Sequence, residues 1–191
     1  RIGVAMHAVA VRPSPLQNLK LAVERCHLNV VGTLFSAYAS ALATLSEDEK
    51  QIGATVIDMG GGCTSIAVFL EGHLVYADVV PRGGFSVTTD IAQLFTAPLS
   101  AAERVKTLYG AAMGDMESGS DVIAIPQSGE QGEEAVQRVP RSMLARVIQP
   151  RLQTIFEEVQ KRLQASGFDL AAGRRVVLTG GACQLAGTRE L

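Results

Sequence analysis

Three consecutive glycines after an acidic residue form the stretch of this sequence best suited to chemistry. Asp58 is the next-to-last residue of the apolar run ATVIDM. Gly60, Gly61 and Gly62 follow this run, and Cys63 opens a second apolar run. Glycines let backbone N–H groups line a concavity and let a phosphate approach without meeting a Cβ atom. The neighbouring carboxylate can hold a hydrated Mg²⁺, which binds through carboxylates, phosphates and water. A plain hairpin turn needs only two residues, so the stretch predicts a phosphate-binding loop with Asp58 as a water-mediated Mg²⁺ ligand.

Two further glycine pairs follow strand-like runs. Gly83 and Gly84 precede a helical pattern, and Gly180 and Gly181 come after the apolar run RVVLT. Such turns occur where a nucleotide contacts backbone amides and a helix N-terminus, although ordinary strand-to-helix turns also use glycine. Taken together and in this order, the three glycine segments predict one nucleotide site.

Glu103 and Lys106 are one helical turn apart in the predicted helix SAAERVKTLYG. The spacing puts both side chains on the same helix face. From the residues alone, a surface ion pair is the simplest interpretation. Ser100 and Glu103 also have the spacing of a capping box, which would start this helix.

The elements that would hold these residues are both strands and helices. Residues 53–80 predict three strands joined by short glycine-containing turns, and residues 114–140 predict a hairpin with a polar loop. Residues 142–165 show the apolar stripe of a long amphipathic helix, which Pro150 should kink or divide. The run Arg175–Leu178 predicts one more strand.

The N-terminal part has weaker patterns. Residues 2–12 alternate or run apolar like a strand, and Pro13 opens a helical pattern. Residues 33–45 predict an alanine-rich helix that can pack closely against a neighbour. The charged run 46–50 is typical of a solvated helix end or turn.

Composition excludes several classes of function. The chain has 191 residues with 17 basic and 19 acidic side chains, well mixed, so no basic surface is expected for nucleic acid. The three cysteines have no metal-ligand or disulfide spacing, which favours a reducing compartment such as the cytoplasm. No apolar run reaches the roughly 18 residues that a membrane-spanning helix requires.

Four strings together resemble a known superfamily: VIDMGGGCTSIAVF, VVPRGG, AERVKTLYG and VVLTGGACQLAG. They look like the second half of the actin, Hsp70 and sugar-kinase superfamily and, within it, the FtsA family of bacterial cell-division proteins. VTTDIAQLF and the stretch from Arg141 to Arg151 are closer to FtsA than to its cousins. The resemblance runs from about Leu16 to the end. It implies an α/β, actin-like (ribonuclease H-like) fold with a mixed sheet, containing the second half and a remnant of the first.

The resemblance also implies domain boundaries. Residues 1–32 correspond to a remnant of subdomain 1C, and 33–50 to the connecting helix of domain 1. Residues 51–95 and 143–191 correspond to the nucleotide-binding subdomain 2A, and 96–142 to subdomain 2B. The family's first phosphate loop and its C-terminal membrane helix are expected to lie outside these residues. We therefore expect this stretch alone to bind ATP weakly.

The family's ligands are ATP and Mg²⁺, and the resemblance assigns them residue by residue. The second phosphate loop corresponds to Asp58 with Gly60, Gly61 and Gly62, and the turn facing sugar and phosphates corresponds to Gly83 and Gly84. The pair bordering ribose and adenine corresponds to Glu103 and Lys106. The adenosine motif corresponds to Gly180, Gly181 and Ala182.

Two departures from the family pattern bear on the chemistry. Cys63 stands where the family usually has Thr, so contacts there would come mainly from the backbone. Hydrolysing relatives carry Glu-Pro at the start of the connecting helix, where this chain has Ser36 and Ala37. We therefore expect ATP binding with at most weak ATPase activity.

By resemblance, ATP would control self-association into filaments that link FtsZ to the cytoplasmic membrane during septum formation. The FtsZ C-terminal tail would bind subdomain 2B, and a C-terminal helix absent here would hold the membrane. The protein would then lie in the cytoplasm, peripheral to the inner face of the membrane at the division site. The alternatives are the pilus-assembly platform PilM and an Hsp70-like ATPase. An Hsp70-like enzyme would have an acid near Ser36 and a basic residue at Thr107.

Overall fold

A four-stranded mixed sheet forms the centre of the fold in the computed structural model, which describes residues 3, 6–113, 121–127, 136–168 and 175–191. The strand order is β3-β2-β1-β6. The three-strand meander predicted from the sequence is confirmed, since β1–β2 and β2–β3 pair antiparallel, whereas β6 pairs parallel to β1. The strands are β1 (Ala54–Met59), β2 (Thr64–Leu70), β3 (His73–Val80) and β6 (Val176–Thr179).

Both faces of the sheet are covered, which explains why β1 and β2 are nearly continuous apolar runs. Successive side chains point to opposite faces. Val56 packs with the alanines of α2 (Ser36–Thr44), while Ile57 packs in the larger core with α4 (Gly84–Phe95) and α6 (Ser142–Ser166). The predicted alanine-rich helix is therefore confirmed, with Ala37 and Ala41 fully buried.

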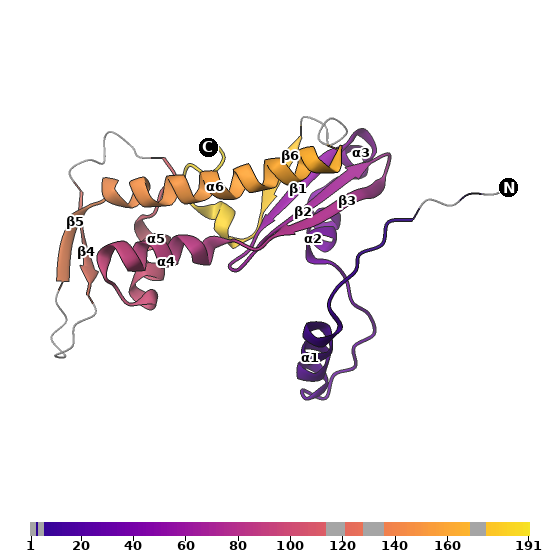
Figure 1. The fold of residues 1–191 in the computed structure, drawn as a ribbon, viewed down its shortest axis with the longest axis horizontal. Helices are drawn as coiled ribbons and strands as arrows, with labels where there is room; N and C mark the ends of the chain where they lie inside the picture. Colours follow the sequence, from indigo (N-terminus) through magenta and orange to yellow (C-terminus); the bar gives the residue numbers. More distant parts are fainter. Residues whose placement is uncertain (1–2, 4–5, 114–120, 128–135, 169–174) are drawn as a thin grey trace.

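Helix α6 is continuous through Pro150, so of the two outcomes expected there, a kink or a division, the division is wrong. Buried side chains on both sides of the proline, Ile148 and Leu152 among them, belong to the same hydrophobic core. Because this packing holds both halves in line, the lost backbone hydrogen bond does not end the helix. Figure 1 shows α6 running along the long axis of the molecule, from the hairpin β4–β5 to the sheet.

The end of the molecule away from the sheet contains α5 (Leu99–Tyr109) and the predicted hairpin, which is confirmed as β4 (Val122–Pro126) paired antiparallel with β5 (Val136–Pro140). Residues 128–134, the expected hairpin loop, lie outside the described residues.

The predicted capping box at Ser100 and Glu103 is wrong. Helix α5 already begins at Leu99, with Pro98 at its N-cap and no side-chain cap, so Ser100 lies inside the helix. A capping box forms instead at Ser46, which starts the short helix α3 (Glu47–Ile52) within the charged run 46–50.

Helix α1 (Pro13–Glu24), near the N-terminus, lies apart from the sheet (Figure 1). This helix forms as predicted but has no buried residue. Residues 6–12 form no strand, contrary to the expectation for residues 2–12. A strand is held by backbone hydrogen bonds to a neighbouring strand, and residues 6–12 pair with none of the described strands. None of the helices in the described part of the chain has the length and hydropathy needed to cross a bilayer.

Candidate nucleotide-binding site

A cleft of about 460 Å³ opens where the glycine loop after β1, helices α4 and α5, and the short helix η2 (Gly181–Gln184) meet. The structure thus brings together three segments that are far apart in the sequence. Seven of the residues predicted from the sequence line this cleft, namely Gly60, Gly61, Gly84, Glu103, Lys106, Gly181 and Ala182.

In the glycine loop, two carbonyl groups accept backbone hydrogen bonds, whereas most of the N–H groups donate to no described residue. The Gly60 N–H donates to the Cys63 carbonyl (2.9 Å), and the carbonyls of Gly60 and Gly61 accept from the N–H groups of Gly84 (2.9 Å) and Phe85 (2.8 Å). Among the described residues, the N–H groups of Gly61, Gly62 and Cys63 donate to no protein acceptor. Since backbone N–H groups require a partner, the loop presents three donors to water or to an anion. Gly62 and Cys63 are exposed and lie outside the cleft lining.

Gly83 and Gly84 bring the start of α4 against this loop. A Cβ atom at Gly83 would lie 2.4 Å from the Gly60 carbonyl oxygen and 2.7 Å from that of Gly61. The sequence suggested that this helix N-terminus contacts the nucleotide with its amides. In the structure, the N–H groups of Gly84 and Phe85 are already bonded to the loop, so the helix start supports the loop rather than offering these two donors to a ligand.

The two glycines after β6, Gly180 and Gly181, differ in whether the surrounding protein leaves room for a side chain. Gly180 has φ +88°, and a Cβ atom there would lie 2.5 Å from the Met59 carbonyl oxygen and 2.7 Å from Asp58 Oδ1. By contrast, a Cβ atom at Gly61, Gly62 or Gly181 would meet no protein atom within 4 Å. Protein packing therefore explains Gly180 but does not explain those three. Glycine at an open surface of this kind is typical of close approach between backbone and ligand.

The ion pair that the spacing favours forms between Glu103 and Lys106, but its lysine is buried rather than at the surface. Its Nζ donates to Glu103 Oε2 (2.7 Å), to Thr88 Oγ1 (2.9 Å) and to the Gly84 carbonyl (3.2 Å). Thr88 also bonds to the Glu103 carboxylate. Burial raises the pKa of Glu103, but the hydrogen bonds from Lys106 and Thr88 outweigh it and hold that pKa below its ordinary value of 4.5. Sequence patterns gave no sign of Thr88, which comes from another helix.

Asp58 is half-buried and does not line the cleft, although it lies beside Gly180. Its Oδ2 accepts a hydrogen bond from Ser40 Oγ (2.9 Å) on α2, and Ser36 Oγ lies 3.5 Å from Ser65 Oγ. Ser40 was not predicted, but its i, i+4 spacing from Ser36 on an apolar helix could have revealed a polar stripe. Within the described residues, no group of three His, Cys, Asp or Glu side chains could hold a metal ion directly.

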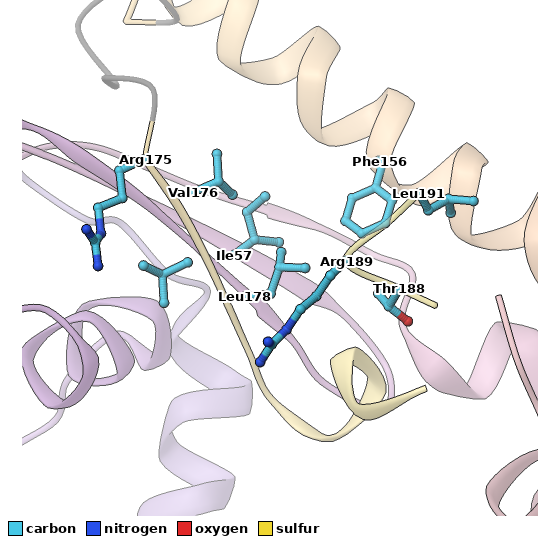
Figure 2. A pocket seen from close by; sticks show the side chains of 9 residues that line it. Ile57, Phe156, Arg175, Val176, Leu178, Thr188, Arg189 and Leu191 are labelled. Atoms are coloured by element: carbon cyan, nitrogen blue, oxygen red, sulfur yellow. The ribbon is translucent and has the colours of Figure 1, made fainter. Parts of the chain in front are cut away.

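A larger hollow, of about 670 Å³, lies along the edge strand β6 and contains none of the predicted site residues. Figure 2 shows it bounded by Phe156 and Leu191 at one end and by Arg175 at the other, with Ile57 and Leu178 between them. Its lining has no glycine turn, so we do not assign the phosphate chemistry to it.

The sequence profile of the family described as Cell division protein FtsA matches residues 55–191. A curated relative, the cell division protein FtsA of Rhizobium meliloti (strain 1021), is 43% identical over 189 residues, which cover 99% of this chain. The chain spans 43% of that relative's length.

Two solved structures share the fold. MreB5 of Spiroplasma citri bound to ADP has a TM-score of 0.75 at 20% identity and covers 93% of this chain and 56% of its own. A chain of the PilM-PilN type IV pilus biogenesis complex has a TM-score of 0.64 at 20% identity, covering 92% of this chain and 43% of its own. These likenesses confirm the predicted actin-like fold. The profile match and the 43% identical relative show that this chain belongs to the FtsA family of cell-division proteins.

Proposed function

We propose that this chain carries the second phosphate loop of an ATP site in an actin-like cell-division protein. One observation carries the proposal: Gly61, Gly62 and Gly181 have open space where a Cβ would be, next to N–H donors without a protein acceptor. A polyphosphate would supply the acceptors for Gly61, Gly62 and Cys63 and would use the access that the missing Cβ atoms leave.

Mg²⁺, when bound with ATP, neutralises phosphate charge. Asp58 would hold it through water, because this carboxylate stands at the end of β1 with no second acid to complete a direct site among the described residues. Ser40 donates to Oδ2 and so orients the carboxylate. Glu103 and Lys106 would border the ribose and the base, and Gly181 and Ala182 would leave room for the base and the α-phosphate.

The proposed activity is binding and switching rather than rapid hydrolysis. Attack on the γ-phosphate needs a residue that positions water. The start of α2 has Ser36 at the position where hydrolysing relatives carry Glu, and the Ser36 hydroxyl lies 3.5 Å from that of Ser65.

At the level of the cell, we propose that ATP binding controls self-association into filaments that link FtsZ to the cytoplasmic membrane at the division site. Membership in the FtsA family and the actin-like fold support this role. The FtsZ C-terminal tail would bind the region 96–142, which contains α5 and the hairpin β4–β5.

The nucleotide proposal is tested with a full-length protein, which is a protein that contains this sequence and is as long as the FtsA relatives. Isothermal calorimetry with ATP should show saturable binding that weakens when EDTA removes Mg²⁺. Absence of binding at millimolar ATP would overturn the proposed site.

The partner proposal needs a separate measurement. The full-length protein should retain an FtsZ C-terminal tail peptide in a pull-down, and a scrambled peptide of the same composition should not be retained. Equal retention of both peptides would reject FtsZ as the partner while leaving the nucleotide proposal intact.

A further inference from the structure

Arg141, the residue immediately before α6, lines the same cleft as Lys106 but was not among the predicted site residues. Its backbone N–H donates to the Asp121 carbonyl (2.8 Å), and its side-chain Nε donates to the Tyr109 carbonyl at the end of α5 (3.1 Å). The side chain is half-buried. These contacts fix the backbone and Nε of Arg141, and its two terminal nitrogens form no hydrogen bond with any residue that the structure describes.

The two basic residues that line the cleft, Lys106 and Arg141, differ in the partners of their N–H donors. Lys106 gives hydrogen bonds to three protein acceptors, so its ammonium group holds α4 and α5 together. Arg141 forms no ion pair with any carboxylate in the described part of the chain. A half-buried arginine that pairs with no described carboxylate therefore lines a site where a ligand is expected.

Arg141 belongs to the end of the cleft away from the glycine loop. Here the chain after α5 is tied to the segment after η2, because the Ala112 N–H donates to the Ala186 carbonyl (2.6 Å). A Cβ atom at Gly110 would lie 3.1 Å from Leu185 Cδ2, so these two segments are in close contact. Leu108, Leu185 and Ala186 give this end of the cleft an apolar lining.

A planar cation beside an apolar wall is suited to a flat aromatic ring. A guanidinium group stacks on aromatic faces, and its plane distinguishes it from the ammonium group of lysine. Phosphates would occupy the opposite end, at Gly60 and Gly61, beside the N–H groups of Gly61, Gly62 and Cys63 that donate to no described residue.

We propose that the Arg141 guanidinium stacks on the base of the bound nucleotide and so contributes base recognition rather than phosphate binding. This inference rests on the proposed nucleotide function of the cleft. It assigns to Arg141 the part of the affinity that depends on the ligand having a base.

The test compares a ligand that has a base with one that lacks it. In the full-length protein, Mg-ATP and Mg-tripolyphosphate affinities are measured by calorimetry for the wild type, Arg141→Ala and Arg141→Lys. Arg141→Ala should weaken ATP binding roughly 3- to 30-fold, the range expected for a stacked cation, and leave tripolyphosphate binding within about twofold of the wild type. Arg141→Lys should recover at most part of the lost ATP affinity.

Arg146→Ala is the matched control, because Arg146 is an exposed arginine of α6 that does not line the cleft. It should bind both ligands like the wild type. If Arg141→Ala fails to fold because the bond to Tyr109 is lost, Arg141→Gln, which can still donate to that carbonyl, replaces it in the same comparison.

Three results would overturn the inference. Unchanged ATP affinity in Arg141→Ala would show that the side chain does not contact the base. Equal weakening of ATP and tripolyphosphate, or full recovery by Arg141→Lys, would show that only its charge matters. If the wild type binds no ATP, the proposed function itself fails and this inference fails with it.

Discussion

At the scale of single residues, neighbouring glycines with the same sequence signal have different physical roles. Gly180 is required by its own backbone angle and by contact with Met59 and Asp58, whereas Gly181 has open space beside it. The first is a requirement of the fold. The second has no internal explanation, and the proposed nucleotide supplies one.

Alanine substitutions separate these two roles. Gly180→Ala should lower the free energy of unfolding by roughly 1–3 kcal/mol, because an alanine would be strained at this backbone angle. Gly181→Ala should leave stability within about 0.5 kcal/mol of the wild type but weaken ATP binding, because its Cβ would occupy ligand space. Urea unfolding and ATP calorimetry on both variants measure this, and a stable Gly180→Ala protein would contradict it.

Lys106 offers a second test at this scale. Lys106→Ala should lower the free energy of unfolding by about 1–3 kcal/mol, because Thr88 and the Gly84 carbonyl lose a buried donor. Lys161→Ala, at an exposed position of α6, is the control and should change stability by less than about 0.5 kcal/mol. Chemical denaturation of the two variants decides the matter, and equal effects would show that the Lys106 contacts contribute no stability.

At the scale of elements, helix α6 connects the two ends of the molecule. Arg151 Nη2 donates to Asp90 Oδ1 on α4 (2.8 Å), and Arg162 Nη1 donates to Asp78 Oδ2 on β3 (2.8 Å). Tyr76 also donates to Asp78, and burial followed by this bond raises the pKa of Tyr76 to about 12. The buried stripe supplies most of the packing, and these polar contacts fix the helix position over the sheet.

The Asp78 contact predicts a pH dependence. Burial raises the pKa of Asp78, but hydrogen bonds from Arg162, the Val79 N–H and Tyr76 outweigh it and hold that pKa below 3.8. A carboxyl group with a depressed pKa in the folded state adds stability above its ordinary pKa, and this is lost as the pH falls through the folded value.

Arg162→Ala should therefore lose about 1 kcal/mol at neutral pH, and its stability should fall less than that of the wild type between about pH 5 and about pH 2. Urea unfolding at several pH values measures both. Arg82→Ala, which breaks the pair with Glu158 at a similar exposure, is the control, with an expected loss below about 1 kcal/mol. Parallel pH curves for Arg162→Ala and the wild type would be incompatible with this account.

At the scale of the whole molecule, the proposed site binds nucleotide without the residue that would activate water. Mg-ATP at 100 times its dissociation constant should stabilise the full-length protein by about 2.7 kcal/mol, seen as a rise in Tm. Phosphate release should stay at the level of a buffer control, with a hydrolysing actin-like protein measured in parallel as the positive control. A steady-state ATPase rate comparable to that control would refute the slow-hydrolysis proposal.

Much of the fold followed from local patterns. The meander of β1 to β3, the hairpin β4–β5 and the stripe of α6 are encoded by apolar periodicity and by short glycine turns, which act over a few residues. Residues 6–12 do not form the strand expected over residues 2–12, and α6 is not divided at Pro150, because each outcome depends on partners distant in sequence. A strand requires a paired edge, and a helix continues through proline where packing holds both sides.

By itself, the sequence determined which segments could hold a phosphate: Asp58 with its three glycines, the turn at Gly83, and the turn at Gly180. The tertiary structure alone decided that Lys106 is buried against Thr88, that Ser40 bonds to Asp58, and that Arg141 joins the same cleft. Glycine turns can be read from sequence because backbone freedom is a local property. Burial and the pairing of side chains from different elements depend on how the helices pack on the sheet, which no spacing along the chain records.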